Sequence, residues 1–134
     1  MRVYAVIDTN VFVSALLTRN AESATAKVLE ALFDRKIISL YNDVILREYN
    51  EVLHRGKFVF PEDDIDRILN TVKTTGVLTD RMDSGEQFPD PDDAVFYEVA
   101  LSKDGAYVVT GNTKHFPRRP IVVTPAEMVE ILGL

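Results

Sequence analysis

The sequence predicts an α/β protein, a three-layer α/β/α sandwich with a mostly parallel central sheet. Short runs of β-branched and apolar residues recur along the chain, separated by segments with the 3.6-residue period of amphipathic helices. Strands that alternate with helices form parallel sheets whose faces the helices cover. The 134 residues match the length of one domain and contain no repeat, so we expect a single domain over residues 1–134.

Five strands are expected, because five runs rich in Val, Ile, Leu and Tyr are too short for ordinary helices. The first run is apolar at every position, which is typical of a central strand buried on both faces. We predict strands over residues 3–7, 37–41, 77–79, 106–110 and 121–123.

Six helices are expected between and after these strands, and several have clear start and stop signals. Asn42 is a suitable N-cap for the third helix, and Gly56 and Gly76 end the third and fourth helices. Thr124, Pro125 and Glu127 form a capping box with a proline in the first turn of the last helix. We predict helices over residues 11–17, 22–35, 43–55, 65–75 and 92–103, and a last helix from residue 125.

The longest predicted loop covers residues 80–91. It is rich in Asp, Ser, Gly and Pro and has no periodicity. Long loops in compact domains tend to be functional.

Composition excludes several classes of function. With 15 Lys and Arg against 21 Asp and Glu, the net charge of −6 argues against a nucleic-acid coat protein, which binds phosphate through many basic residues. Nucleic-acid chemistry would need bound cations and a local basic patch. The chain has no Cys, which excludes disulfides, a thiolate nucleophile and cysteine-ligated zinc. No apolar segment approaches 18 residues, so we expect a cytoplasmic protein without membrane association.

The residue that most needs an explanation is Asp8, which ends the first strand. In open parallel sheets ligands bind beyond the carboxyl ends of the strands, so this carboxylate is aimed into the crevice where ligands bind. The alternative is that Asp8, Thr9 or Asn10 simply caps the following helix.

Glu48 is anomalous on the helix predicted over residues 43–55. It lies on the apolar stripe formed by Val44, Ile45, Val52 and Leu53. A carboxylate that faces the core destabilises the fold unless it is paired with a cation, hydrogen-bonded or bound to a metal. A salt bridge to Arg47, Arg55 or an arginine elsewhere in the chain is the alternative.

Two further segments bring polar side chains to the same edge of the sheet. One helix start does not need three acids, yet the chain has Asp90, Asp92 and Asp93 there. If Asp92 is the cap, Asp93 can point toward Asp8. Asn112 follows the fourth strand and offers a neutral oxygen there. Converging carboxylates repel one another, and a hard divalent cation with oxygen ligands, Mg²⁺ or Mn²⁺, relieves the repulsion. Such a site suits phosphodiester hydrolysis.

Four blocks of residues carry a resemblance to a known family. They are residues 7–14, residues 48–53, residues 90–93 with Ala100, and residues 108–112 with His115 and Phe116. In this order they resemble the PIN domain, the metal-dependent ribonuclease domain of VapC-type toxins from toxin–antitoxin pairs. The resemblance covers nearly the whole chain and implies a PIN-like fold and an endoribonuclease.

The resemblance also assigns roles to residues. Asp8, Glu48 and Asp93 match the three acidic positions that are catalytic and bind the metal, with Asp92 as the alternative to Asp93. At the fourth position Asn112 replaces the usual acid, so it would reach a metal only through water. Thr9, Asn10 and Thr110 match polar positions that hold the ligands. We expect RNA as substrate, a cognate antitoxin as partner and a homodimer.

Candidate substrate contacts come from a basic cluster in the sequence. The cluster consists of Lys114, Arg118 and Arg119 with Arg55 and Lys57, and ordinary surface charge is the alternative. The substrate-binding candidates are Arg55, Lys57, Lys114 and His115, the last because it lies beside the predicted crevice. A non-catalytic relative that binds RNA or a protein remains open, because of Asn112 and the acidic composition. An aspartyl-phosphate phosphatase would need an Asp where Asn10 stands.

Overall fold

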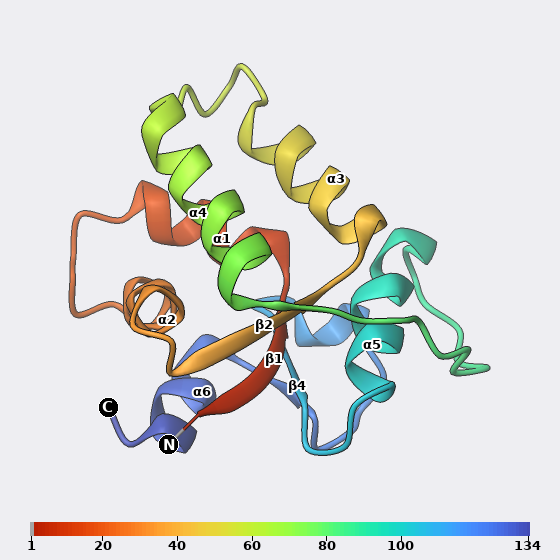
Figure 1. Cartoon of the computed structure of the whole chain (residues 1–134). Helices are drawn as coiled ribbons and strands as arrows, with labels where there is room; N and C mark the ends of the chain where they lie inside the picture. Colours follow the sequence, from red (N-terminus) through yellow and green to blue (C-terminus); the bar gives the residue numbers. More distant parts are fainter. Residues whose placement is uncertain (1) are drawn as a thin grey trace.

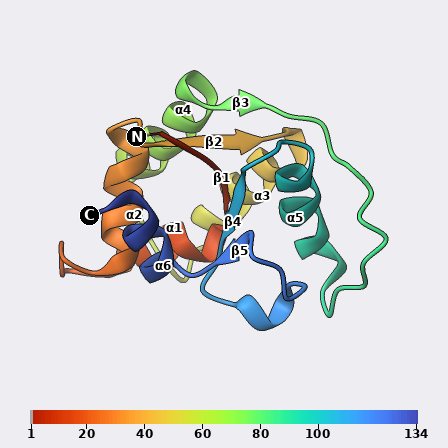
Figure 2. The same cartoon turned by 90° about the horizontal axis from the view of Figure 1, so that it is seen from below.

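The computed structural model describes residues 2–134 and shows a five-stranded, all-parallel sheet between helices (Figure 1). The strand order is β3-β2-β1-β4-β5, with β1 in the centre. Viewed from below, α1, α2 and α6 lie on one side of the sheet and α5 on the other (Figure 2). The predicted α/β sandwich with a parallel sheet is therefore confirmed. The strands are β1 (Val3–Ile7), β2 (Ile37–Tyr41), β3 (Val77–Leu78), β4 (Tyr107–Val109) and β5 (Val122–Val123).

The helices agree with the sequence prediction in number and order, and differ from it at their ends. They are α1 (Thr9–Leu17), α2 (Ala24–Phe33), α3 (Asp43–Leu53), α4 (Glu62–Thr75), α5 (Ala94–Leu101) and α6 (Pro125–Leu132). Short 3₁₀ turns occupy Pro91–Asp93 and Thr113–His115. The predicted caps Asn42 and Thr124 both accept hydrogen bonds from the backbone of the first helical turn, and Glu127 completes the capping box.

The start of α5 corrects one prediction. Asp92 is not the cap. Asp90 accepts a hydrogen bond of 3.0 Å from the Asp92 backbone N–H and starts the 3₁₀ turn instead. Proline at the first position of this turn needs no N–H partner, so the acceptor stands two residues earlier than the sequence suggested. Asp92 and Asp93 therefore remain free of capping bonds from their own side chains.

The sheet register places the ends of β1 and β4 side by side. Ile7 pairs with Val109, and the Asp8 backbone N–H donates to the Val109 carbonyl at 2.9 Å. Asp8 and Thr110 are consequently the first residues beyond two neighbouring strands. The crevice predicted at the carboxyl edge begins with this pair.

An aromatic cluster joins three helices near the carboxyl end of β1. The ring of Tyr49 in α3 packs edge-on against Phe12 in α1 at 4.9 Å and lies 6.2 Å from Phe96 in α5. Its hydroxyl donates to the Ile7 carbonyl at 2.5 Å. All three rings are buried. The cluster therefore fixes α1, α3 and α5 relative to the end of β1.

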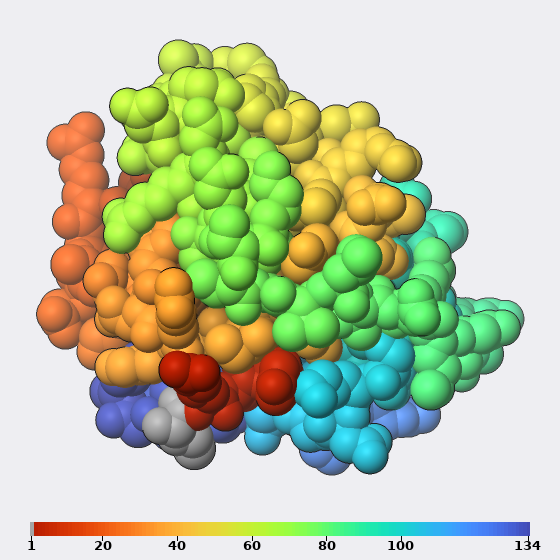
Figure 3. All heavy atoms as spheres, viewed as in Figure 1, coloured from red at the N-terminus to blue at the C-terminus, as the bar shows by residue number. Residues whose placement is uncertain are grey.

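The chain after α4 approaches the sheet very closely at Gly76. A Cβ atom there would lie 2.5 Å from the Ser39 carbonyl oxygen and 2.3 Å from that of Val72, so only glycine fits. Beyond β3, the segment of residues 79–90 crosses the surface toward α5 (Figure 3). Among the described residues, no helix is long and apolar enough to cross a membrane.

Candidate active site

Asp8 lies at the carboxyl end of β1 and is only 5% exposed. It occupies the N-cap position of α1, yet its side chain makes no capping hydrogen bond. Instead its Oδ2 atom accepts a hydrogen bond of 2.7 Å from the hydroxyl of Thr110. The Thr9 and Asn10 backbone N–H groups also lie close enough to lower its pKa. Capping of α1 does not account, however, for the bond to Thr110, which comes from the far end of the chain.

Glu48 reaches the same edge from the middle of α3. Its Oε2 atom accepts a hydrogen bond of 2.8 Å from the hydroxyl of Thr9, the residue after Asp8. Within residues 2–134, Glu48 forms no salt bridge, so neither Arg47 nor Arg55 neutralises it. Thr9 and Thr110 therefore each hold one carboxylate, through hydroxyl groups that leave its negative charge uncompensated.

Asp93, the residue just before α5, brings a third carboxylate to this edge of the sheet. Its side chain is 19% exposed. Its Oδ2 atom lies 3.6 Å from Nδ1 of His115, in the 3₁₀ turn after β4. The contact is an ion pair only when the histidine is protonated. Asp93 thus has a weak and pH-dependent positive neighbour.

The three acids act on one another electrostatically. Burial raises the pKa of Asp93 to about 6, and the charges of Asp8, Asp90 and Glu48 add to this, while His115 opposes it. Burial also raises the pKa of Asp8, although the Thr110 hydroxyl partly offsets the effect. The pKa of buried Tyr49 is raised as well, first by burial and then by the charges of Asp8 and Glu48. Negative charge from three segments is therefore concentrated in one place.

The donor chemistry of this place suits a hard divalent cation, because the groups that gather there are carboxylates. As the side chains lie, however, no group of three or more His, Asp and Glu residues within positions 2–134 is close enough to hold a metal ion. The carboxylates share a crevice and an electrostatic field without forming a closed cage. Their role as ligands stays a prediction.

The remaining predicted site residues are distributed around this crevice. Thr110 is fully buried and its hydroxyl also accepts a hydrogen bond of 2.9 Å from the Asn112 backbone N–H, which ties Asp8 to the loop after β4. Asn112 and Asn10 are exposed, and neither side chain makes a hydrogen bond within the described part of the chain. Lys114 is exposed beside Asn112 and His115.

Arg55 and Lys57 lie in the loop after α3. Both are exposed, and the Lys57 ammonium is 5.0 Å from the centre of the Phe58 ring. Neither residue lines the cleft that adjoins Glu48. The geometry gives no support to their predicted contact with substrate.

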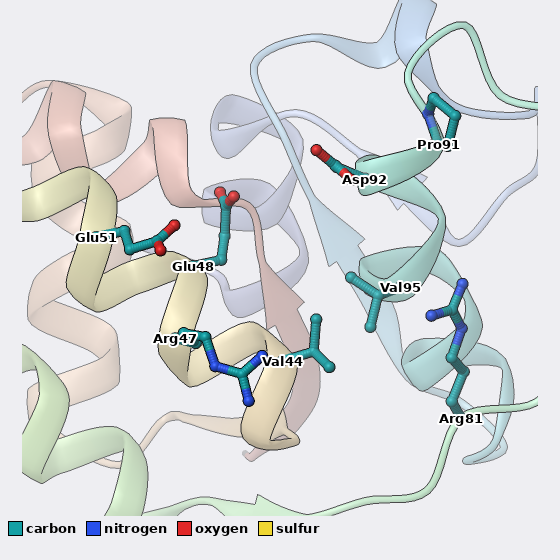
Figure 4. A pocket seen from close by; sticks show the side chains of 8 residues that line it. All are labelled: Val44, Arg47, Glu48, Glu51, Arg81, Pro91, Asp92 and Val95. Carbon is teal, nitrogen blue, oxygen red and sulfur yellow. The ribbon is translucent and has the colours of Figure 1, made fainter.

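A cleft of about 250 Å³ lies between α3 and α5 (Figure 4). Glu48 forms part of the wall of this cleft. The cleft therefore adjoins the crevice that contains Asp8 and Asp93. Asp92 points into it from the opposite wall. The lining residues are Val44, Arg47, Glu48, Glu51, Arg81, Pro91, Asp92 and Val95.

Sequence reasoning missed three residues of this region: Tyr49, Arg47 and Arg81. Tyr49 lies four residues after Ile45, on the apolar stripe of α3, which was a sufficient signal that it is buried. Nothing in the sequence indicated its hydrogen bond to Ile7. Arg81 stands in a loop without periodicity, and only the fold brings it to the cleft.

The family model described as PIN domain matches residues 4–114. The chain is also similar to the "Uncharacterized protein MJ1680" of Methanocaldococcus jannaschii, with 30% identity over 115 residues that cover 84% of this chain and 72% of that protein. No solved structure matches it.

Proposed function

The chain belongs to the PIN domain family, and from this premise we propose that it is a metal-dependent endoribonuclease that hydrolyses RNA phosphodiester bonds. PIN domains are generally nucleases, and these usually use divalent metals. The family therefore supports a hydrolase that acts on nucleic acid. RNA as the substrate, and Mg²⁺ or Mn²⁺ as the metal, belong to the proposal.

One observation carries the proposal. Carboxylates that follow β1, lie in α3 and precede α5 share a crevice, and the charges of the first two raise the pKa of the third. Burial and the charges of Asp8 and Asp90 raise the pKa of Asp93 to about 6, and Glu48 contributes in the same direction. A structural network would compensate such charges with donors or cations, as buried ion pairs do. Uncompensated acids in a crevice instead favour binding of a cation.

Each side chain then has a distinct task. Asp8, Glu48 and Asp93 would hold the cation, which supplies Lewis acidity that polarises the phosphodiester and makes water a better nucleophile at neutral pH. Thr110 and Thr9 orient Asp8 and Glu48 through their hydroxyl groups. Tyr49 keeps α3 against the end of β1, so that Glu48 stays beside Asp8.

The cellular role and the partners are part of the same proposal. We infer that the protein is the toxin of a toxin–antitoxin pair, that a cognate antitoxin neutralises it and that it acts as a homodimer. Growth arrest on expression of the chain, absent for the Asp8→Asn variant, is the expected result. Unimpaired growth with abundant folded protein would contradict the toxin role.

The test of the activity is RNA cleavage by purified protein with Mg²⁺ or Mn²⁺ and with EDTA. We expect cleavage with either metal, none with EDTA, and a loss of more than about 100-fold for Asp8→Asn, because even residues that only orient a ligand are worth about 10–100-fold. Circular dichroism should show that the variant is folded. Cleavage retained by Asp8→Asn would overturn the site.

A non-catalytic module that binds RNA or a protein is the second candidate, and Asn112 favours it, since an amide adds no negative charge for a metal. The Asn112→Asp variant separates the two. A gain of a few-fold in metal-dependent cleavage is expected for a weakened enzyme, because a fourth carboxylate increases the charge that holds the cation. Binding of RNA without cleavage by either form would favour the module.

A further inference from the structure

The cleft between α3 and α5 contains two arginines that the proposed hydrolysis does not use. Arg47 extends from α3, and Arg81 extends from the segment that crosses to α5 (Figure 4). In this view Glu48, Glu51 and Asp92 lie in the upper part of the cleft and the two arginines in the lower part. The cleft thus has an acidic end that adjoins Asp8 and a basic end away from it.

Arg81 is held in position by a buried carboxylate. Its Nε atom donates to Oε1 of Glu98 at 2.5 Å, and Glu98 is only 6% exposed. Burial alone would raise the pKa of Glu98, but hydrogen bonds from Ser84 and Arg81 outweigh it, so the pKa is lowered. Glu98 is therefore ionised at neutral pH and anchors the guanidinium by a charge-assisted hydrogen bond.

The rest of the Arg81 guanidinium is available for another anion. Its two terminal nitrogens make no hydrogen bond within residues 2–134, and the side chain is 45% exposed. A guanidinium that is already oriented loses less rotamer entropy when it binds than a free one. Arg47 is exposed and has no hydrogen bond or ion pair to the described residues.

We propose that the basic end of this cleft binds a backbone phosphate of single-stranded RNA next to the one that is cut, through Arg47 and Arg81. The assignment rests on the proposed function, because it takes the scissile phosphate to be at Asp8, Glu48 and Asp93. A polyanion held at the acidic end places its neighbouring phosphate along the cleft, where two guanidinium groups offer planar, bidentate donors. They supply the local positive charge that a chain of net charge −6 needs.

The walls of the cleft favour a single strand over a duplex. Val44 is 46% exposed at its rim, and exposed Pro91 adds further apolar surface. Such surface can contact a ribose or an unstacked base, which a duplex keeps inside its helix. The volume of about 250 Å³ also suits one nucleotide unit better than a double helix.

The test is equilibrium binding of a fluorescent single-stranded RNA oligonucleotide with a cleavage-resistant backbone to the wild-type protein with Mg²⁺ over a range of KCl concentrations. Adding Arg47→Gln or Arg81→Gln should each raise Kd about tenfold, since each removes charge-assisted hydrogen bonds. The dependence of log Kd on log salt should fall by about 0.7 per arginine, the value for single strands.

The matched control is Arg35→Gln, which removes one positive charge at the opposite edge of the sheet, between α2 and β2. It should leave Kd and the salt dependence almost unchanged. Arg47→Gln cannot disturb the fold through a lost partner, so it keeps the test decisive if Arg81→Gln loosens the loop. The same RNA annealed to its complement should bind more weakly than the single strand.

The outcomes separate this inference from the proposed function. Equal effects of Arg47→Gln and Arg35→Gln would overturn the arginine site, even if the wild-type protein cleaves RNA. Equal affinity for the duplex would overturn the assignment to single strands. Arginine-dependent binding without any cleavage by the wild-type protein would instead overturn the nuclease and leave the phosphate contacts standing.

Discussion

Two acidic regions near α5, one at Glu98 and one around Asp8, differ in how their charge is compensated. Glu98 accepts hydrogen bonds from the Ser84 backbone N–H, the Ser84 hydroxyl and Arg81, and its pKa is lowered. Burial raises the pKa values of Asp8 and Asp93, and the charges of Asp8 and Glu48 raise that of Asp93 further. One buried carboxylate is fully satisfied, and the others are left with excess negative charge.

The difference separates a structural carboxylate from a functional one. Glu98 holds the segment of residues 79–90 against α5, because each of its donors lies in that segment. The acids around Asp8 come from separate elements, and their like charges do not stabilise the fold. A region that costs stability in the folded protein is where a ligand of opposite charge can bind most favourably.

The largest effect on stability is expected at the satisfied side. Glu98→Ala should lower the free energy of unfolding by about 3 kcal/mol, because it leaves Ser84 and Arg81 without their acceptor. Since the folded pKa of Glu98 is lowered, this contribution is present at neutral pH and is lost as the pH falls. Urea denaturation at pH 7 and pH 4 measures it. Glu98→Gln, which keeps one acceptor oxygen, is the matched control and should lose less.

Addition of Mg²⁺ should stabilise the other side. A cation that binds only the folded protein raises the free energy of unfolding by about 2.7 kcal/mol at a hundredfold excess over its dissociation constant. Thermal denaturation of the wild-type protein with Mg²⁺ and with EDTA should therefore differ by several degrees, and the Asp8→Asn variant should not respond. An equal shift in both proteins would point to cation binding elsewhere.

A smaller effect is expected from Asp93→Asn, in the opposite direction to Glu98→Ala. The folded pKa of Asp93, about 6, lies above its unfolded value. The stabilisation from the protonated form is therefore present below about pH 4 and is lost as the pH rises through 6.

The Asn variant avoids this loss. It should be more stable than the wild-type protein by about 1 kcal/mol at pH 7, after allowance for solvent screening, and equal to it near pH 4. Parallel urea titrations at the two pH values check the prediction. A variant less stable at pH 7 would mean that Asp93 is compensated, as Glu98 is.

Much of the site could be anticipated from local patterns. Asp8 follows a fully apolar strand and Glu48 interrupts an apolar stripe, and both anomalies pointed to the crevice in which the structure finds them. The N-caps Asn42 and Thr124 were equally readable, because a cap acts on the backbone a few residues away. The hypothesis that Asp92 is a cap was wrong, because Asp90, two residues earlier, takes that role.

The contacts that the sequence did not reveal are long-range. Thr110 and Asp8 are 102 residues apart, and Tyr49 and Ile7 are 42 residues apart. The basic cluster expected at Arg55 and Lys57 does not line the cleft, whereas Arg47 and Arg81 do. A sequence shows which residues are charged. Where a loop places those residues depends on how the rest of the chain packs.

The sequence by itself determined the alternation of strands and helices, the family and the acidic residues at the ends of elements, because periodicity, capping and strand composition act over a few residues. The tertiary structure decided which of those acids are compensated and which repel one another. That outcome depends on side chains brought together from distant segments, and on the burial that makes their charges interact strongly.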